Sequence, residues 1–187
     1  ALDVAAHDLY GKLNGVSIHQ YWGFDTSRMP LTNYTIGIDD LSKMKSKIKA
    51  FPWPVYKIKL GTDDDLSIVK ALRKTTDAVF RVDANCAWTA AQTIEYANSF
   101  KQLGVEFIEQ PLATGDWEGM AEIYKHSTLP IMADESCIEM TDVARCKGYF
   151  HGVNIKLMKC GGLAVARKMI AQAQSMGLMV MVGCMTE

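Results

Sequence analysis

The chain has 187 residues, of which 49% are hydrophobic and 22% charged, an ordinary balance for a globular protein that excludes wholesale disorder. Its 20 basic and 21 acidic residues give a net charge of −1, so the composition predicts neither a nucleic-acid partner nor attachment to an anionic membrane. The sequence contains no run of about 18 apolar residues, so it predicts no membrane-spanning helix. Its five cysteines have no C-x-x-C spacing, so they indicate neither a disulfide framework nor a zinc site, and a reducing, cytoplasmic compartment is expected.

Short β-rich runs alternate with longer amphipathic segments along the chain. After a helix-like opening from Ala1, the predicted strands are Tyr34–Ile38, Val55–Leu60, Ala78–Asp83, Glu106–Glu109, Ile131–Ala133, Val153–Lys156 and Leu178–Val182. The helical patterns between them include Thr89–Leu103, Asp116–Lys125, Thr141–Lys147 and Leu163–Met176. Repeated strand–helix units of this kind predict parallel strands joined by right-handed crossovers.

Seven such strands predict an α/β fold of the (β/α)8 TIM-barrel type, present as an incomplete barrel, because a closed barrel of eight strands typically takes about 250 residues. The competing architecture is a doubly wound open sheet. That sheet usually carries a G-x-G-x-x-G turn after its first strand, and the sequence has none. Because the chain begins at Ala1 and stops at Glu187, directly after an apolar run, we expect residues 1–187 to be a truncated barrel domain. Its exposed strand edge would leave the isolated piece inactive and prone to aggregation.

Charged residues recur at the carboxyl ends of five successive predicted strands, namely Lys59, Asp83, Glu109, Asp134 and Lys156. They lie 22 to 26 residues apart, one strand–helix unit each, so we expect them at the same mouth of the barrel, where barrel enzymes keep their sites. Side chains alternate along a strand, so these residues and Lys57 would face the barrel axis. The neighbours that would face the helices are Ile58, Val82, Ile108, Ala133 and Ile155. Taken singly, each charge has the simpler interpretation of a strand-end group in water.

The three carboxylates would repel one another and raise one another's pKa unless a cation lay among them. Asp83, Glu109 and Asp134 offer oxygen ligands without histidine or cysteine, a set that suits Mg²⁺, or Mn²⁺ as a substitute. The alternative is a metal-free salt-bridge network that joins the acids to Lys57, Lys59, Arg81 and Lys156.

Two lysines lie four strands apart, which places them on opposite sides of an eight-stranded ring with the acids on the arc between them. One of Lys59 and Lys156 could remove the α-proton of a substrate carboxylate, and the other could return a proton to the opposite face, as racemisation or epimerisation requires. The charge of Lys57 would lower the pKa of Lys59, and Lys57 could hold a carboxylate oxygen of the substrate. The weakly acidic α-proton needs a divalent cation to stabilise the enediolate that its removal leaves.

Further polar residues follow the same strands. Asn85, Gln110 and Glu135 are predicted to orient the metal ligands, with solvent-facing loop positions as the alternative. Arg81 is interpreted as a buried charge-pair residue, and Lys159 as a loop or helix-start lysine outside the site.

Three residues at strand ends are predicted substrate contacts, namely Ile36, Met185 and Glu187, with core packing as the alternative for Ile36 and Met185. Two other function classes remain open from the residues alone. A Schiff-base aldolase would use Lys59 or Lys156 as its amine, although three metal-type carboxylates would then be hard to explain. A non-catalytic barrel would need none of these groups.

Five short motifs surround the charged residues. They are K-x-K at Lys57, D-A-N at Asp83, E-Q-P at Glu109, A-D-E-S at Asp134 and N-I-K-L-M-K-C-G-G at Lys156. As a set they resemble the enolase superfamily, in particular its muconate-lactonizing subgroup and, within it, the dipeptide epimerases of the L-Ala-D/L-Glu epimerase type. The similarity covers nearly the whole chain, and the combination is highly specific although each motif alone is weak.

The resemblance implies a modified (βα)7β barrel with the following site residues: Mg²⁺ ligands Asp83, Glu109 and Asp134, acid/base lysines Lys59 and Lys156, and Lys57 at the substrate carboxylate. It implies an isomerase that epimerises dipeptides through the enediolate, with a muconate-type cycloisomerase or an o-succinylbenzoate synthase as alternatives. The family's N-terminal capping domain and its eighth strand, which carries an Asp-x-Asp pair for the dipeptide's ammonium group, are expected outside this sequence. We also expect a small-molecule substrate and a homo-oligomer, while the dipeptide's side chains and stereochemistry stay open.

Overall fold

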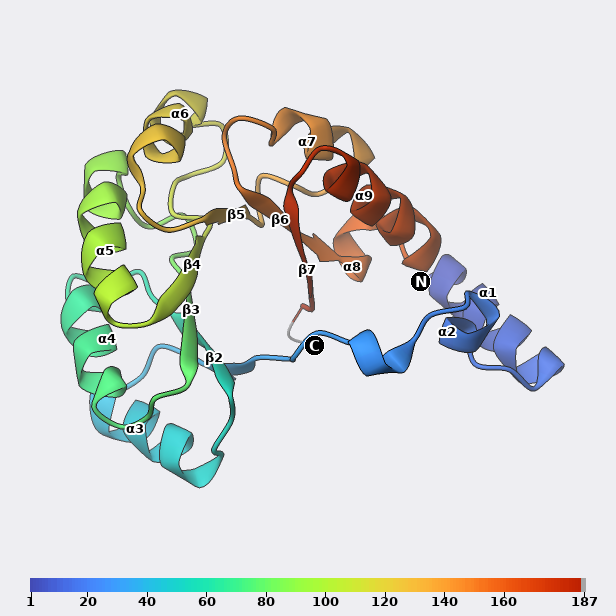
Figure 1. Ribbon diagram of the computed structural model, residues 1–187, viewed down its shortest axis with the longest axis horizontal. Coiled ribbons are helices and arrows are strands. Elements are labelled where there is room, and N and C mark those ends of the chain that lie inside the picture. The colour runs from blue at the N-terminus through green and yellow to red at the C-terminus, as the bar shows by residue number, and fades with distance from the viewer. Residues whose placement is uncertain (186–187) are drawn as a thin grey trace.

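The computed structural model describes residues 1–185, and its strands form one parallel sheet in which neighbours in sequence are neighbours in space. The strands are β1 (Tyr34–Ile36), β2 (Val55–Lys59), β3 (Val79–Asp83), β4 (Val105–Glu109), β5 (Ile131–Ala133), β6 (Gly152–Lys156) and β7 (Met179–Gly183). Their order is β1-β2-β3-β4-β5-β6-β7, and the sheet curves into a partial barrel (Figure 1). Among residues 1–185 no pairing joins β7 to β1. The predicted incomplete barrel is therefore confirmed, and the doubly wound order is excluded.

Helices cover the convex side of the sheet (Figure 1). The helices are α1 (Leu2–Asn14), α2 (Ile18–Tyr21), the 3-10 helix η1 (Thr26–Arg28), α3 (Leu41–Ala50), α4 (Asp65–Arg73), α5 (Ala90–Gln102), α6 (Trp117–His126), α7 (Met140–Arg145), α8 (Leu157–Cys160) and α9 (Leu163–Ser175). Local side chains start the helices where the sequence predicts, because the first backbone N–H groups of a helix need acceptors. Thr89 accepts from Gln92 N–H ahead of α5, and Asp116 accepts from Gly119 N–H ahead of α6. In the described part of the chain no helix combines the length and apolarity needed to cross a membrane.

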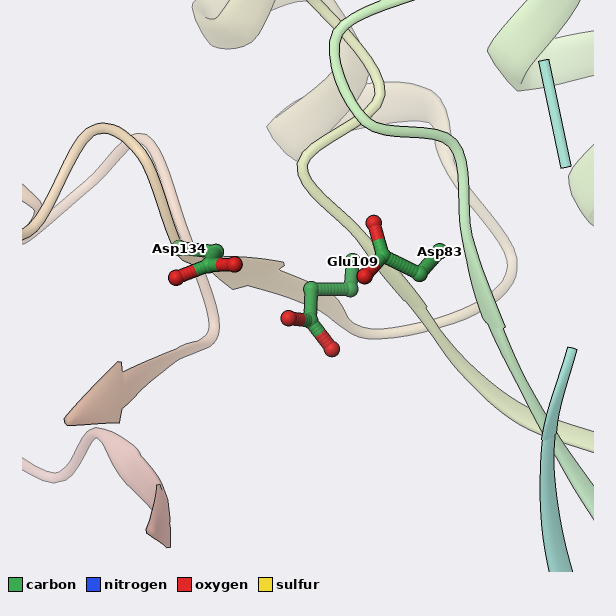
Figure 2. A group of neighbouring side chains, drawn as sticks. All are labelled: Asp83, Glu109 and Asp134. Carbon is green, nitrogen blue, oxygen red and sulfur yellow. The ribbon is translucent and has the colours of Figure 1, made fainter. Parts of the chain in front are cut away.

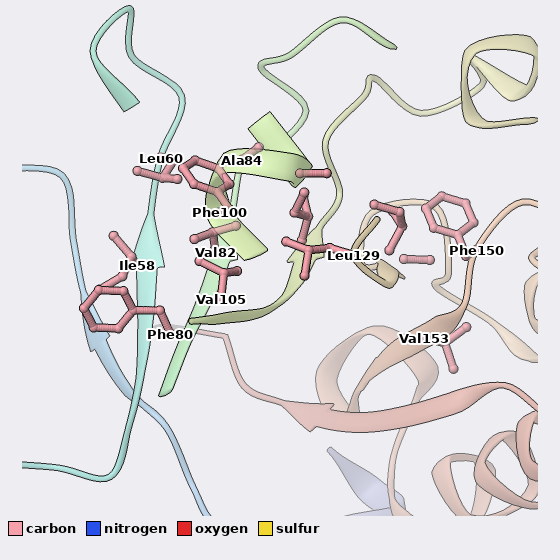
Figure 3. Close-up of a cluster of buried hydrophobic side chains, with 14 of the residues drawn as sticks. Ile58, Leu60, Phe80, Val82, Ala84, Phe100, Val105, Leu129, Phe150 and Val153 are labelled. Atoms are coloured by element: carbon pink, nitrogen blue, oxygen red, sulfur yellow. The ribbon is translucent and has the colours of Figure 1, made fainter. Parts of the chain in front are cut away.

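The hydrophobic core lies between the sheet and these helices. The strand residues predicted to face the helices are all fully buried there, namely Ile58, Val82, Ile108, Ala133 and Ile155. They pack in one cluster with helix residues such as Val69, Phe100 and Ile123. Figure 3 shows part of this cluster, including Ile58, Val82 and Phe100. Because side chains alternate along a strand, this packing turns the next residue of each strand toward the barrel axis. The core therefore fixes the direction of the charged strand ends.

Strand ends differ from the prediction by one or two residues. The first strand stops at Ile36 rather than Ile38, and Ile38 is exposed outside the ladder with β2. The last strand begins at Met179 and extends to Gly183, because Lys156 of β6 pairs with Gly183. In the described residues β7 pairs with β6 alone, and its Val182 is 57% exposed. Its other edge offers the unpaired backbone groups of an edge strand.

The N-terminal helix is fastened to the segment that follows β6. Asp3 in α1 accepts a hydrogen bond from the backbone N–H of Ala164, in the first turn of α9, at 3.1 Å. A Cβ at Gly162 would collide with the Asp3 carboxylate, so this close approach requires glycine there. Helix α1 therefore holds the turn between α8 and α9, which lies shortly after Lys156 in the chain.

A buried carboxylate ties the loop after β2 to the loop after β3. Asp65 is fully buried and accepts hydrogen bonds from the backbone N–H groups of Gly61 and Thr62, at 2.9 Å each, and from the Thr62 hydroxyl at 2.8 Å. It also accepts from the Trp88 indole N–H at 2.7 Å, across 23 residues. The two loops follow Lys59 and Asp83 directly, so Asp65 helps to fix the chain at both strand ends.

We expect Asp65→Ala to lower the free energy of unfolding by about 3 kcal/mol or more, because it leaves several buried donors without an acceptor. Urea unfolding measures this. The matched control is Asp63→Ala in the same loop, whose exposed side chain should be worth no more than about 0.5 kcal/mol. Equal unfolding midpoints for the two variants would contradict the role given to Asp65.

Candidate active site

Three acids meet at the carboxyl ends of β3, β4 and β5. Asp83 and Glu109 are the last residues of β3 and β4, and Asp134 directly follows β5. One carboxylate oxygen from each lies within 4.8 Å of the others, and all three residues are fully buried. Figure 2 shows Glu109 between the other two, as the strand order requires. The predicted convergence of these acids is therefore present.

Strand register produces this convergence. Asp83 pairs with Glu109 across the β3–β4 ladder, and Glu109 pairs with Met132 of β5. Asp134 lies two residues after Met132 and therefore on the same face of its strand. The parallel ladder thus brings side chains 25 and 26 residues apart in sequence to one place.

Lysines from β2 and β6 approach the acids from their two ends. Lys59 Nζ lies 2.7 Å from Asp83 Oδ2, and Lys156 Nζ lies 2.6 Å from Asp134 Oδ2. Lys57 Nζ lies 2.8 Å from Asp83 Oδ2 and 2.8 Å from both oxygens of Glu109. Each of the two predicted acid/base lysines therefore contacts a different outer acid, with Glu109 between them.

Burial and charge act against each other within this cluster. Burial raises the pKa of Glu109 to about 7, with the charge of Asp83 adding to the effect and Lys57 opposing it. Burial acts to lower the pKa of Lys57, but the neighbouring Glu109 and Asp83 carboxylates outweigh this effect and raise the pKa overall. Burial likewise acts to raise the pKa of Asp134, but hydrogen bonds from two lysines, Lys156 and Lys159, lower it overall. The surroundings of Glu109 therefore disfavour its negative charge.

The donor set fits a divalent cation. Three buried carboxylates lie together, and within residues 1–185 Glu109 Oε2 accepts no hydrogen bond, although Lys57 Nζ lies 2.8 Å away. Oxygen ligands grouped in this way suit Mg²⁺ or Mn²⁺, and in the structure the lysines balance the negative charge of the acids. Arg81, placed in the alternative network, contacts Glu106 at 2.6 Å and Asn33 at 3.0 Å instead of the acids. It is a charge-pair residue as predicted, although Glu106 is 44% exposed.

Three polar residues predicted to orient the metal ligands lie beside the acids in sequence, and that role stays a prediction. Gln110 is fully buried, and its Oε1 accepts the backbone N–H groups of Asp134 and Ser136 at 3.0 Å each. Asn85 accepts from Lys59 Nζ at 2.9 Å and donates to Glu135 at 3.2 Å. Gln110 and Asn85 both have left-handed backbone, with φ of 36° and 45°, an unusual conformation that marks the turns leaving β4 and β3. Gln110 thus holds the main chain of a proposed ligand, and Asn85 holds a proposed acid/base lysine.

Sequence reasoning missed two residues of this cluster. Lys159 was interpreted as a helix-start lysine outside the site; it does lie in α8, but its Nζ is 2.7 Å from Asp134 Oδ1. Asn154 was given no role, yet its Nδ2 donates to Glu109 Oε1 at 2.7 Å. The spacing of both residues from Lys156 could have indicated that they lie near the site. Asn154 precedes Lys156 by two residues on the same strand face, and Lys159 follows it by three, about one helical turn.

The predicted substrate contacts have different outcomes. Ile36 pairs with Ile58 in the β1–β2 ladder, so it shares the helix-facing side and is fully buried in the core. This placement does not support a substrate contact and fits the packing alternative, because a residue that contacts substrate would have to face the barrel axis and Ile36 faces the helices. Met185 is 45% exposed after β7, and its role stays a prediction. Glu187 lies outside the described residues.

Comparisons with known proteins agree with this geometry. The family model described as "Enolase C-terminal domain-like" matches residues 41–187. The chain is 55% identical over 187 residues to the "L-Ala-D/L-amino acid epimerase" of Flavobacterium johnsoniae, covering all of this chain and 56% of that protein. It is 42% identical to the "L-Ala-D/L-Glu epimerase" of Bacteroides thetaiotaomicron, covering all of this chain and 50% of that protein. The chain therefore spans about half the length of the curated relatives that it matches.

A solved structure of a dipeptide epimerase has the same fold as this chain. The crystal structure of the dipeptide epimerase from Enterococcus faecalis V583 complexed with Mg and the dipeptide L-Leu-L-Tyr superposes with a TM-score of 0.91 at 34% identity. The match covers 99% of this chain and 55% of that one. The chain is thus similar over its whole length to part of a protein crystallised with both Mg and a dipeptide.

Proposed function

The chain belongs to the enolase C-terminal domain-like family, and on this basis we propose that it supplies the catalytic barrel of a Mg²⁺-dependent dipeptide epimerase. One observation carries the proposal. Lys59 and Lys156, from strands on either side of the three acids, each contact a different outer acid of the trio. The names of the similar proteins, which are epimerases acting on L-Ala dipeptides, support the substrate class.

In the proposed site Asp83, Glu109 and Asp134 hold Mg²⁺. When bound, this ion supplies positive charge that stabilises the enediolate formed when the substrate loses its α-proton. Lys57 lies beside Asp83 and Glu109, so its ammonium group can hold the substrate carboxylate at the same place. Gln110 keeps Asp134 in position through the backbone on both sides of Glu135.

The two lysines perform the proton transfers on opposite faces of the substrate. One Nζ, as a neutral amine, takes the α-proton, and the other, as an ammonium group, donates a proton to the face opposite. In the structure Lys59 Nζ forms an ion pair with Asp83, and Lys156 Nζ forms one with Asp134. We expect metal binding to release them, because the same carboxylate oxygens then neutralise the cation. Metal binding would thus prepare the lysines for catalysis.

The activity belongs to the whole protein that carries this chain. Because the matched relatives are nearly twice as long, residues 1–187 are proposed to be its C-terminal barrel domain, with a capping domain and an eighth strand outside the chain. A muconate-type cycloisomerase or o-succinylbenzoate synthase would use the same cluster and is the second candidate. A cytoplasmic location and a homo-oligomer remain predictions.

Proton NMR in D₂O tests the function directly. With Mg²⁺ and a panel of L-Ala-L-X dipeptides that includes L-Ala-L-Glu, we expect loss of the α-proton signal of residue X and growth of the signals of the L-D diastereomer. Addition of EDTA should stop both changes, and Mg²⁺ or Mn²⁺ should restore them. No exchange with any dipeptide would overturn the proposal, and turnover of a muconolactone or an o-succinylbenzoate precursor would favour the second candidate.

A further inference from the structure

Asn154 makes a hydrogen bond across the barrel interior that no step described so far uses. It lies on β6, is fully buried, and donates from Nδ2 to Glu109 Oε1 of β4 at 2.7 Å. Strand β5 separates β4 from β6 in the sheet, so this bond does not belong to any ladder. It joins the end of β4 to the middle of β6, two strands that do not pair with each other.

The bond distinguishes the two oxygens of Glu109. Lys57 Nζ is 2.8 Å from each of them, so its position alone does not set which oxygen faces the other acids. The Asn154 amide donates to Oε1, and no group in residues 1–185 donates a hydrogen bond to the buried Oε2. An amide also donates without adding charge, so the carboxylate keeps its negative charge for a cation.

The space for this amide is provided by Gly183. A Cβ at position 183 would lie 2.9 Å from Asn154 Nδ2 and 3.0 Å from its Cγ, closer than such atoms approach. Gly183 lies in β7 and is not among the residues with positive φ, so its backbone conformation does not require glycine. The absence of a side chain there is explained by the neighbouring amide.

The amide is retained although it leaves a buried acceptor unsatisfied. Asn154 Oδ1 is buried and has no hydrogen-bond partner in the part of the chain that the structure describes. Such an atom destabilises the fold, and an apolar side chain of similar size at position 154 would avoid that cost. The residue therefore suits a role other than fold stability.

We infer that Asn154 is a positioning residue that turns Glu109 Oε2 toward the cation, and that Gly183 preserves the gap in which its amide works. The inference deepens the proposed function and rests on its metal site. Partners that orient metal ligands in this way typically change metal affinity by 10- to 100-fold when they are lost.

Mn²⁺ affinity, measured by electron paramagnetic resonance without substrate, tests the inference in the protein that carries this chain. Asn154→Ala and Asn154→Leu are each expected to raise the Mn²⁺ Kd by about 10- to 100-fold without lowering the urea midpoint of the metal-free protein. Asn98→Ala, which removes an exposed asparagine of α5, should leave the Kd unchanged. Gly183→Ala should raise the Kd as well, because its methyl group displaces the amide.

The double variant Asn154→Ala with Gly183→Ala separates this mechanism from general damage. If the methyl group acts only through the amide, the double variant binds Mn²⁺ about as tightly as Asn154→Ala alone, so the two effects do not add. Additive losses, or a wild-type Kd in folded Asn154→Ala, would overturn the inference while leaving the proposed function intact. Absence of Mn²⁺ binding by the wild-type protein would overturn both.

Discussion

Lys59→Ala and Lys156→Ala should each reduce epimerisation by about 10³-fold, and each should retain α-proton exchange with D₂O for only one of the two diastereomers. The reason is positional. The two lysines contact opposite ends of the acid cluster, so each faces one side of an α-carbon held there. A variant with one lysine can remove and return a proton only on the side that lysine faces.

Proton NMR of each diastereomer incubated separately in D₂O measures this difference. The two variants should have complementary preferences, one exchanging the L-L dipeptide and the other the L-D dipeptide. Lys101→Ala, which removes an exposed lysine of α5, serves as the control and should epimerise at the wild-type rate. If both variants exchange the same diastereomer, the lysines do not flank the substrate.

Glu109→Gln should weaken Mg²⁺ or Mn²⁺ binding by at least about 100-fold, because affinity depends on the number of charged ligands. The same variant should not destabilise the metal-free protein. Since burial raises the pKa of Glu109 to about 7, the folded chain holds this proton more tightly than the unfolded chain does. The metal-free protein therefore loses stability as the pH rises from about 4.5 to about 7, and a neutral glutamine avoids that loss.

Urea unfolding at pH 8 in EDTA, together with Mn²⁺ titration, separates the two interpretations of the acids. For a metal centre, Glu109→Gln unfolds at the wild-type urea concentration or above it and binds Mn²⁺ poorly. For a structural salt-bridge network, loss of one charge from a buried pair costs about 3–5 kcal/mol. Glu106→Gln, on the same strand but outside the cluster, is the matched control: it should leave Mn²⁺ binding unchanged, and loss of its partly exposed ion pair with Arg81 should cost no more than about 1 kcal/mol.

The sheet and the acids could be predicted because parallel strands repeat one simple rule. Each strand–helix unit returns the chain to the same mouth, and alternation then sets the direction of Asp83 and Glu109. This rule does not predict which side chains of β1 face the barrel axis. Its three residues carry no charged marker, so only the ladder with β2 reveals that Ile36 faces the helices.

Contacts between loops and across the barrel also lie outside that rule. In the run Asp63-Asp64-Asp65, three acids look alike as a solvated turn. Asp65 is the one whose carboxylate accepts hydrogen bonds from Gly61, Thr62 and the distant Trp88, and the last of these contacts depends on the tertiary fold. Lys159 reaches Asp134 because the short helix α8 begins directly at the end of β6, so its spacing of three residues from Lys156 is informative only once that junction is known.

Crystals of the protein soaked with Mn²⁺ and a dipeptide, with diffraction recorded at the anomalous edge of manganese, would show where the cation and the substrate bind. We expect one Mn²⁺ bound by an oxygen of each of Asp83, Glu109 and Asp134, with Lys59 Nζ and Lys156 Nζ on opposite sides of the dipeptide's α-carbon. A manganese peak elsewhere, or both Nζ atoms on one side of that carbon, would contradict this expectation.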